Sequence, residues 1–463
     1  MRKVALAFLL AAIAVVAQPT ELKGSFRRPE KNGWIFVHLE GGPARLGFQH
    51  GYLLTPEIED LLKAEKIALA HDSGRDWDFF RDAAEKVFLP HIEAQYREEL
   101  EGIVAGVRAH GADIDLIDVV MLNAWVELSP YYTNWYEKQH RLLSAGTRPV
   151  PEHCSAFVAT GSYTRDGRPV IAHNNWVDYS IGSRWNVIFD ISPATGHRML
   201  MDGVPGVIDS GDDFGENDAG LVITETTIGH FSGFDPNGIP EFVRARKAMQ
   251  YATNIDEFAA IMKEGNNGAY ANTWLLADMH TNEIGSLELG LKHVTLQRTK
   301  DGYFAGSNFP SNPDLIREET DFSPSDKRAS ENARHTRWDQ LMERNKGRID
   351  VATAQRFLAD HYDTVDKVNE PSERTLCGHI ELSARGSNPW QPAYGPAGAA
   401  QNKATDATMA LRMSFTAAMG HACGLDFHAT KHLSEHPQFA WQKDILRDLP
   451  AHPWTTFTAA VPH

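Results

Sequence analysis

The amino-acid sequence predicts an α+β protein whose helices come first and whose strands come later. Between residues 57 and 128, apolar residues recur at helical spacing, and one such stripe consists of Leu100, Ile103, Val104 and Val107. Later in the chain, short β-branched and aromatic runs are interrupted by turn residues. Helical patterns lie between these runs. Strands with intervening helices are typical of a layered α+β domain.

The first 17 residues are typical of a cleaved export signal. Arg2 and Lys3 form a positively charged start, and an apolar run follows up to Val16. Ala17 then supplies the small residue that precedes a cleavage point at Gln18. The run is too short for an ordinary membrane span, so an uncleaved anchor is the weaker alternative. We therefore expect a mature protein that is secreted or periplasmic, without stable membrane insertion.

Residues 18–153 are expected to form a mainly helical fragment. Residues 33–54, GWIFVHLEGGPARLGFQHGYLL, suggest a strand and a glycine-rich turn that lead into a helix. Gly111 ends the helix that carries the apolar stripe, and Asp115 caps the next one. Residues 136–153 carry basic, small and proline residues and are predicted to be a linker.

Residues 154–463 are expected to contain most of the strands. Seven runs have strand character: CSAFVATGSY, RPVIAHNNW, WNVIFDI, GLVITETTI, YANTWLLADM, GSLELG and HVTLQRT. Helical patterns occupy residues 241–265, 333–345 and 350–362. Residues 388–408 are rich in Pro, Gly and Ala and are predicted to be a loop.

The first two of these runs are predicted to form a β-hairpin around the Asp-Gly pair at residues 166–167. Residues whose numbers sum to 333 would then lie opposite each other, so Cys154 would face Tyr179. In that ladder His173 lies six residues further along, about 20 Å from the thiol. A bulge, a longer turn or a strong twist would be needed to bring the two together.

Charge and cysteine content argue against two classes of protein, the general nucleic-acid binders and the disulfide scaffolds. The formal net charge of −16 argues against a general nucleic-acid binder, which needs a basic surface. Three cysteines are too few for a disulfide scaffold, and an odd number leaves one thiol free in an exported protein. Cys377 and Cys423 could pair in an oxidising compartment, which would leave Cys154 as the odd one. The sequence leaves that pairing open.

Five sequence blocks, in order, carry a resemblance to a known family: CSAFVAT…AHNNW, SGDDFGENDAGLVITETTIG, NNGAYANTWLLADM, YFAGSNFP and ATDATMALRMSFTAAMGHACGLDF. They resemble the phospholipase B-like proteins, which are N-terminal-nucleophile (Ntn) hydrolases. Penicillin V acylase and acyl-coenzyme A:6-aminopenicillanic acid acyltransferase are more distant relatives. The resemblance implies a four-layer α/β/β/α sandwich with a helical N-terminal segment.

The resemblance also implies that the chain cuts itself between His153 and Cys154. The new N-terminal cysteine would be the nucleophile and, through its α-amine, the general base. A free α-amine has a pKa of about 7.7–8.0 and a thiol one of about 8.5, so a proton can pass between them near neutral pH. The two fragments, 18–153 and 154–463, are expected to stay associated. A buried structural cysteine is the plainer alternative.

Five further site residues follow from the same resemblance. His173 would hold or polarise the thiol, and Trp176 would form a wall of the pocket. Thr227 and Asn308 would stabilise the oxyanion of the tetrahedral intermediate. Arg334 would be the distal arginine of the family.

The sequence also allows structural roles for some of these residues and other candidates for the remaining roles. His173 and Trp176 could simply be core residues, because both residue types are often buried for packing alone. Arg337 lies one turn from Arg334 on the expected helix and could take its role. Asn272 is a second asparagine candidate.

The expected reaction is acyl transfer to water through a Cys154 acyl-enzyme, with a lipid or an N-acyl small molecule as substrate. The family name points to glycerophospholipid esters, whereas the more distant relatives cut amides, and a cysteine acyl-enzyme suits both. The alternative from another class is a non-catalytic secreted binding protein on the same scaffold. No cofactor is expected. His428, His432 and His436 share a helical face, but no HExxH motif accompanies them, so no metal is predicted.

Overall fold

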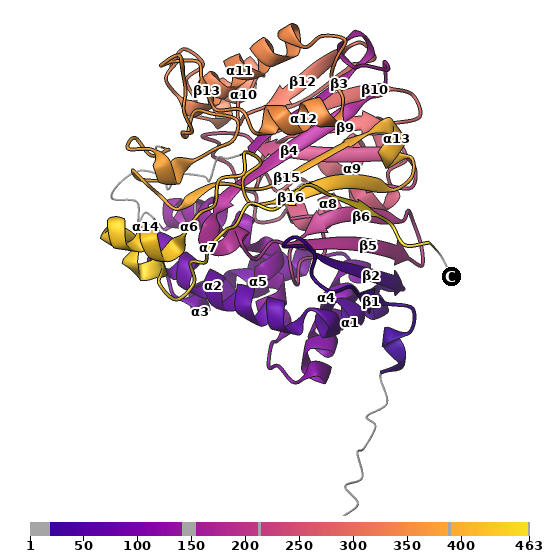
Figure 1. Ribbon diagram of the computed structural model, residues 1–463. Helices are drawn as coiled ribbons and strands as arrows, with labels where there is room; N and C mark the ends of the chain where they lie inside the picture. The colour runs from indigo at the N-terminus through magenta and orange to yellow at the C-terminus, as the bar shows by residue number, and fades with distance from the viewer. Residues whose placement is uncertain (1–18, 141–153, 212–213, 388–389, 462–463) are drawn as a thin grey trace, which may run out of the picture.

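The computed structural model describes residues 19–140, 154–211, 214–387 and 390–461. Two β-sheets lie face to face at the centre, and helices cover both outer sides (Figure 1). The expected α+β class and its four-layer arrangement are therefore confirmed. The expected export signal and residues 141–153, which end at the expected cleavage point, lie outside the described residues.

The larger sheet contains strands from both sides of Cys154. Its strands, in spatial order, are β1 (Phe26–Arg27), β2 (Ile35–Gly41), β5 (Val187–Pro193), β6 (Met199–Gly203), β7 (Phe214–Asn217), β8 (Leu221–Thr227), β9 (Asn272–Asp278), β10 (Glu283–Leu289) and β11 (Val294–Thr299). β2 pairs with β5 in parallel, and the other neighbours are antiparallel. The N-terminal part of the chain is thus hydrogen-bonded into a sheet that the later part completes.

The smaller sheet has the first strand of residues 154–463 among its inner strands. Its strands, in spatial order, are β12 (Gly302–Gly306), β3 (Cys154–Thr160), β4 (Val170–Asp178), β15 (Ala397–Asp406), β16 (Ser414–Met419) and β17 (Thr455–Thr458). All five pairings are antiparallel. A separate two-stranded ribbon consists of β13 (Tyr362–Asp363) and β14 (Val368–Asn369).

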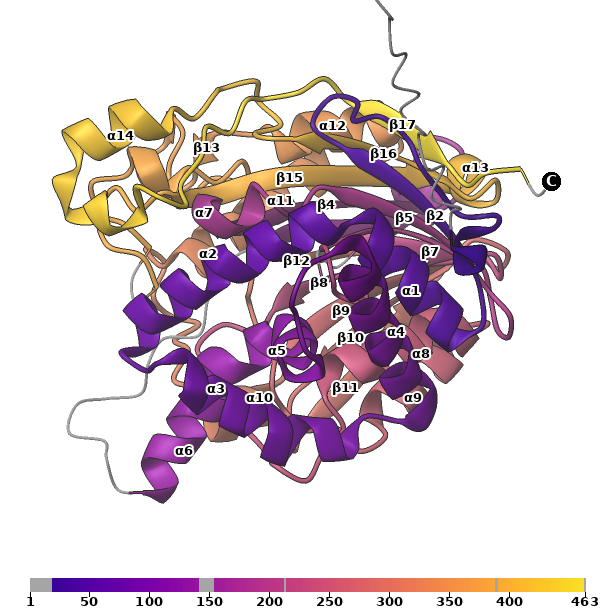
Figure 2. The same cartoon turned by 90° about the horizontal axis from the view of Figure 1, so that it is seen from below.

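The helices divide between the two outer faces. They are α1 (Pro43–Leu53), α2 (Thr55–Ser73), α3 (Trp77–Ala83), α4 (Ala94–His110), α5 (Leu116–Glu127), α6 (Thr133–Gln139), α7 (Tyr179–Gly182), α8 (Glu241–Tyr251), α9 (Ile255–Lys263), α10 (Pro313–Glu319), α11 (Ser330–Arg344), α12 (Val351–Leu358), α13 (Ala407–Ala410) and α14 (Ala429–Glu435). α11 and α12 pack on the smaller sheet, while α1, α8 and α9 pack on the larger one. Figure 2 shows the N-terminal helices in front of the sheets. Among the described helices, none is both long and apolar enough to cross a bilayer.

The local helix signals are confirmed. Asp115 caps α5 by accepting a hydrogen bond from the backbone N–H of Asp118 at 3.0 Å. Gly111 ends α4 in the left-handed conformation, with φ 111°. The predicted linker, however, begins too early, because α6 continues to Gln139.

Close glycine contacts lock α1 against α4. A Cβ atom added to Gly47 would lie 1.9 Å from the carbonyl oxygen of Glu99, and one added to Gly106 would lie 2.2 Å from that of Phe48. The helices therefore approach more closely than larger side chains would permit. The apolar stripe on α4 is buried in the same core.

The predicted register of the β3–β4 hairpin is wrong by four residues. Cys154 lies opposite Asn175 instead of Tyr179, and Ala156 lies opposite His173. The connection is longer than a two-residue turn because Gly161–Tyr163 form a 3₁₀ turn and Thr164 bridges to Ile349. His173 is consequently only two residues along the ladder from Cys154.

The predicted loop at residues 388–408 is also wrong in its second half. Ala397–Asp406 form β15, which lies between β4 and β16 at the centre of the smaller sheet. Gly and Ala are poor strand formers in general. Here both faces of the strand are covered, and a Cβ atom on Gly398 would lie 2.4 Å from the carbonyl oxygen of Gly378. Close packing, which no local pattern reveals, requires the small residues.

Candidate active site

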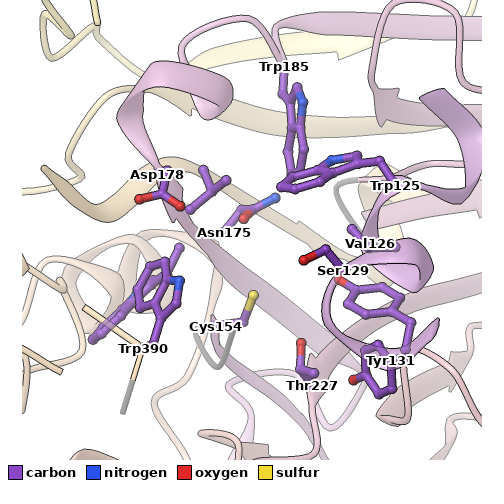
Figure 3. Close-up of a pocket in the computed structure, with 13 residues that line it drawn as sticks. Trp125, Val126, Ser129, Tyr131, Cys154, Asn175, Asp178, Trp185, Thr227 and Trp390 are labelled. Carbon is purple, nitrogen blue, oxygen red and sulfur yellow. The ribbon is translucent and has the colours of Figure 1, made fainter. Parts of the chain in front are cut away.

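Cys154 is the first residue of β3 and lines a pocket. Its side chain is buried, with 4% of the residue exposed. In Figure 3 the thiol points into the space between Trp390 on one side and Ser129 and Tyr131 on the other. The thiol is free of any disulfide.

Asn308 holds the backbone of Cys154 from the turn after β12. Its Oδ1 atom accepts a hydrogen bond from the backbone N–H of Cys154 at 3.2 Å. Its Nδ2 atom donates to the carbonyl oxygen of Thr227 at 2.8 Å. Asn308 has a φ of 63°, in the left-handed region that asparagine tolerates better than most residues. This one amide therefore ties the start of β3 to the end of β8.

Arg334 completes the support of Cys154 from α11. Its Nη1 atom donates to the carbonyl oxygen of Cys154 at 2.6 Å and to Ser155 Oγ at 3.2 Å. Its Nη2 atom donates to Asn308 Oδ1 at 2.9 Å. The guanidinium lies 4.5 Å from the ring centre of Trp176, within the range of a cation–π contact.

The helical period explains why Arg334, and not Arg337, reaches the site. Trp338 lies one turn after Arg334 on the buried face of α11, and it packs against Phe157 of β3. Arg337 projects elsewhere and forms an ion pair with Asp360, with an Nη2–Oδ2 distance of 2.6 Å. Of the two arginines considered from the sequence, only Arg334 has a hydrogen bond to Cys154 among the contacts that the structure describes.

His173 lies opposite Ala156 and therefore on the Cys154 face of the smaller sheet. The residue is fully buried, and neither ring nitrogen has a hydrogen-bond partner among the described residues. Burial, and then the nearby positive charge of Lys403, holds the pKa of His173 well below its usual value. His173 is therefore a neutral imidazole, and it is not one of the residues that line the pocket.

The walls of the pocket are largely aromatic. The empty space amounts to about 560 Å³, part of it open to solvent. The lining residues are Trp125, Val126, Ser129, Tyr131, Cys154, Asn175, Trp176, Val177, Asp178, Trp185, Thr227, Tyr270 and Trp390. Both the segment before residue 140 and the strand-rich part contribute, so the pocket exists only when the two are assembled.

Trp176 and Thr227 both line the pocket. Trp176 packs against Ile380, Ala397 and Ala399 on its other side. Thr227 is the last residue of β8 and lies directly opposite Asn272 in the sheet. The side chain of Asn272 is fully buried, and neither of its polar atoms has a hydrogen-bond partner among the described residues.

One acidic side chain lies in this apolar wall. Burial, and then the nearby carboxylate of Asp72, raises the pKa of Asp178 well above its usual value. Gln391 Nε2 donates a hydrogen bond to Asp178 Oδ1 at 2.6 Å. A protonated Asp178 would keep the wall uncharged near neutral pH.

Sequence reasoning missed most of the aromatic wall. Trp125, Tyr131, Trp185, Tyr270 and Trp390 come from four separate segments of the chain. The run NAWVELSPYY, which contains the first two, is conspicuously aromatic. That run is equally compatible with an ordinary helix core, so it could not single out a pocket.

Comparisons with known proteins agree with the resemblance seen in the sequence. The family model for phospholipase B matches residues 79–455, well over half of the chain. An uncharacterized protein from Archaeoglobus fulgidus is 25% identical over 262 residues, which cover 51% of this chain and 40% of that protein. Phospholipase B-like 1 from Bos taurus is 22% identical over 283 residues, which cover 54% of this chain and 51% of that protein. The chain thus matches about half the length of these relatives.

One solved structure that matches part of the chain is a variant of conjugated bile acid hydrolase from Clostridium perfringens. It has 11% sequence identity and a TM-score of 0.33, and the match covers 57% of this chain and 89% of that one. At these values the likeness says nothing about the chemistry of the pocket.

Proposed function

The chain belongs to the phospholipase B family, and on that premise we propose that it is an exported hydrolase that cleaves acyl bonds through a covalent intermediate on Cys154. The observation that carries the proposal is the double support of Cys154. Asn308 receives its N–H, and Arg334 donates to its carbonyl oxygen, while the thiol faces the pocket. Two side chains from separate elements thus converge on the backbone of a cysteine whose thiol faces the pocket.

The first proposed step is the cut between His153 and Cys154. The Cys154 thiol attacks the carbonyl carbon of His153, the peptide bond shifts to a thioester, and the nitrogen of Cys154 takes up a proton. Water then hydrolyses the thioester and leaves a carboxylate on His153 and a free amine on Cys154. The amine inherits the hydrogen bond to Asn308 Oδ1, so it would be held beside its own thiol.

The second proposed step is acyl transfer. The α-amine takes the proton of the thiol, and the thiolate attacks the substrate carbonyl. The proposed donors to the oxyanion are the Asn308 amide and the Thr227 side chain, which lines the pocket. One N–H of the Asn308 amide already donates to the carbonyl oxygen of Thr227. The leaving group departs with a proton from the amine, and water then releases the acyl group. His173 would have no direct contact with the substrate, because it is fully buried and lies outside the pocket lining.

The proposed substrate carries a hydrophobic acyl group. The pocket has six aromatic side chains in its lining: Trp125, Tyr131, Trp176, Trp185, Tyr270 and Trp390. Its aromatic walls suit an alkyl or aryl group better than a charged one, and the net charge of −16 disfavours anionic headgroups held by charge alone. Esters of glycerophospholipids are the first candidates, and N-acyl amides are the alternative.

Intact-mass analysis of the purified protein tests both steps together. We expect fragments of 136 and 310 residues that co-purify after loss of residues 1–17. Brief incubation with a panel of phospholipids and N-acyl amino acids should add one acyl mass to the larger fragment, at Cys154. Cys154→Ala should remain a single uncut chain that gains no acyl mass. An uncut chain that turns over these substrates would refute the mechanism, and a cut chain that never acylates would favour a binding protein.

A further inference from the structure

Four potential metal ligands converge outside the pocket, on three segments that are distant in sequence. His361 follows α12, Cys377 and His379 precede a 3₁₀ turn at Ile380–Leu382, and Cys423 follows β16. One ligand atom from each residue lies within 4.8 Å of the other three. Cys377 and His379 are fully buried, and His361 and Cys423 are partly buried. The four side chains therefore converge on one point, and two of them are shielded from bulk water.

The spacing of these atoms matches a tetrahedral site. The sulfur atoms of Cys377 and Cys423 each lie 3.4 Å from Nε2 of His379. With Zn–S bonds near 2.3 Å and Zn–N bonds near 2.0–2.1 Å, a tetrahedron has sulfur-to-nitrogen edges of about 3.5 Å. Two edges of such a tetrahedron are thus already present.

The histidines are oriented for coordination. Nδ1 of His379 lies 2.8 Å from Oε1 of Glu381, which directs Nε2 toward the two sulfur atoms. A carboxylate behind a ligating imidazole is the usual second layer of a zinc site. Nε2 of His361 is buried and has no hydrogen-bond partner among the described residues.

A competing trio shares His379 but is less suitable. His379, Glu381 and His421 also lie within range of one another. Both ring nitrogens of His421 are engaged, Nδ1 with the carbonyl oxygen of Leu425 and Nε2 with the hydroxyl of Tyr179, each at 2.8 Å. His421 and Glu381 therefore belong to the layer that supports the four ligands.

We propose that His361, Cys377, His379 and Cys423 bind one Zn²⁺ ion in a closed structural site. On binding, each thiol releases one proton, and the ion is held by two thiolates and two neutral imidazoles with no change of oxidation state. Thiolate and imidazole together favour zinc over magnesium or calcium. Four protein ligands leave no position for water, which is the arrangement of structural zinc and not of catalytic zinc.

The site would also steady one wall of the pocket. Gly378 lies between two of the ligands, and a Cβ atom there would lie 2.1 Å from Cζ2 of Trp176. Trp176 in turn lies against Arg334 and lines the pocket. A metal ion that holds residues 377–379 would therefore restrain Trp176, although it lies outside the pocket itself.

Metal analysis of the full chain, purified without chelators from zinc-supplemented cells, tests the site directly. We expect about one zinc per chain in the wild type and in Cys154→Ala, which removes a different thiol. Cys423→Ser and His361→Asn should lower the zinc content at least about tenfold. His436→Ala, a change to a histidine outside the cluster, should leave the zinc content unchanged.

Cobalt substitution of the wild type provides a readout that needs no variant. Co²⁺ exchanged into the protein should give the intense visible bands of tetrahedral cobalt together with thiolate-to-cobalt charge transfer. Two outcomes would overturn the proposal. One is a folded wild-type chain whose mass is lower by two hydrogens, with Cys377 and Cys423 joined as a disulfide. The other is a folded chain without bound zinc in which both thiols react with an alkylating reagent.

Discussion

Replacement of Arg334 by lysine should separate the geometry of the guanidinium from its charge. The guanidinium donates to the carbonyl oxygen of Cys154 at 2.6 Å and, through its other terminal nitrogen, to Asn308 Oδ1 at 2.9 Å. A lysine ammonium keeps the charge but cannot reproduce this planar fork. At least one charge-assisted hydrogen bond is lost, which costs about 1.5–3 kcal/mol.

If that support is needed in the transition state, kcat/KM should fall roughly 10- to 150-fold, because about 1.4 kcal/mol corresponds to a factor of ten. The assay is initial-rate hydrolysis of whichever acyl substrate labels Cys154, with denaturing gels to score the cut independently. Arg337→Lys is the matched control. It lies on the same helix but pairs with Asp360, so kcat/KM should change less than about threefold.

Arg334→Gln adds a pH readout that lost packing would not produce. A neighbouring positive charge disfavours a protonated amine, so removing it should raise the pKa of the Cys154 α-amine. The acidic limb of the kcat/KM profile should then move to higher pH. Wild-type rates in Arg334→Lys, or an equal loss in Arg337→Lys, would refute the assignment of Arg334 to the support of Cys154.

Four further predictions concern other parts of the chain. N-terminal sequencing of exported protein should begin at or near Gln18, and recovery of Met1 in the mature protein would contradict the export signal. Cys154→Ala should abolish both the cut and turnover, whereas Cys377→Ser should mainly lower the melting temperature; turnover in Cys154→Ala would remove the cysteine mechanism. Gly378→Ala should lower the free energy of unfolding in urea by about 1–3 kcal/mol, because the added methyl group would overlap Trp176. An unchanged urea midpoint would show that Trp176 can move aside without cost. Burial raises the pKa of Glu65 well above its usual value, and its carboxylate oxygens have no hydrogen-bond partner among the described residues. The stability that this raised pKa contributes is therefore present below about pH 4.5, the usual pKa of a glutamate. It is lost as the pH rises toward the pKa of Glu65 in the folded protein. Glu65→Gln should therefore stabilise the protein more at pH 8 than at pH 5, and an equal effect at both pH values would show that this carboxyl does not titrate as argued.

Features that depend on neighbours in the chain can be predicted from the sequence. The cap at Asp115, the end of α4 at Gly111 and the buried stripe on that helix follow from local hydrogen bonding and the 3.6-residue period. The family resemblance, carried by short blocks of ordered sequence, is confirmed by the family match over residues 79–455.

Features that depend on distant partners become visible only in the folded chain. The β3–β4 register is set in part by the contact of Thr164 with Ile349, and β15 is a strand because close packing on both faces admits its small residues. The cluster of His361, Cys377, His379 and Cys423 matches no motif spacing, since its members meet only when three segments fold together. Local patterns record the energetics of nearby residues, whereas register, close packing and ligand convergence depend on which distant surfaces meet.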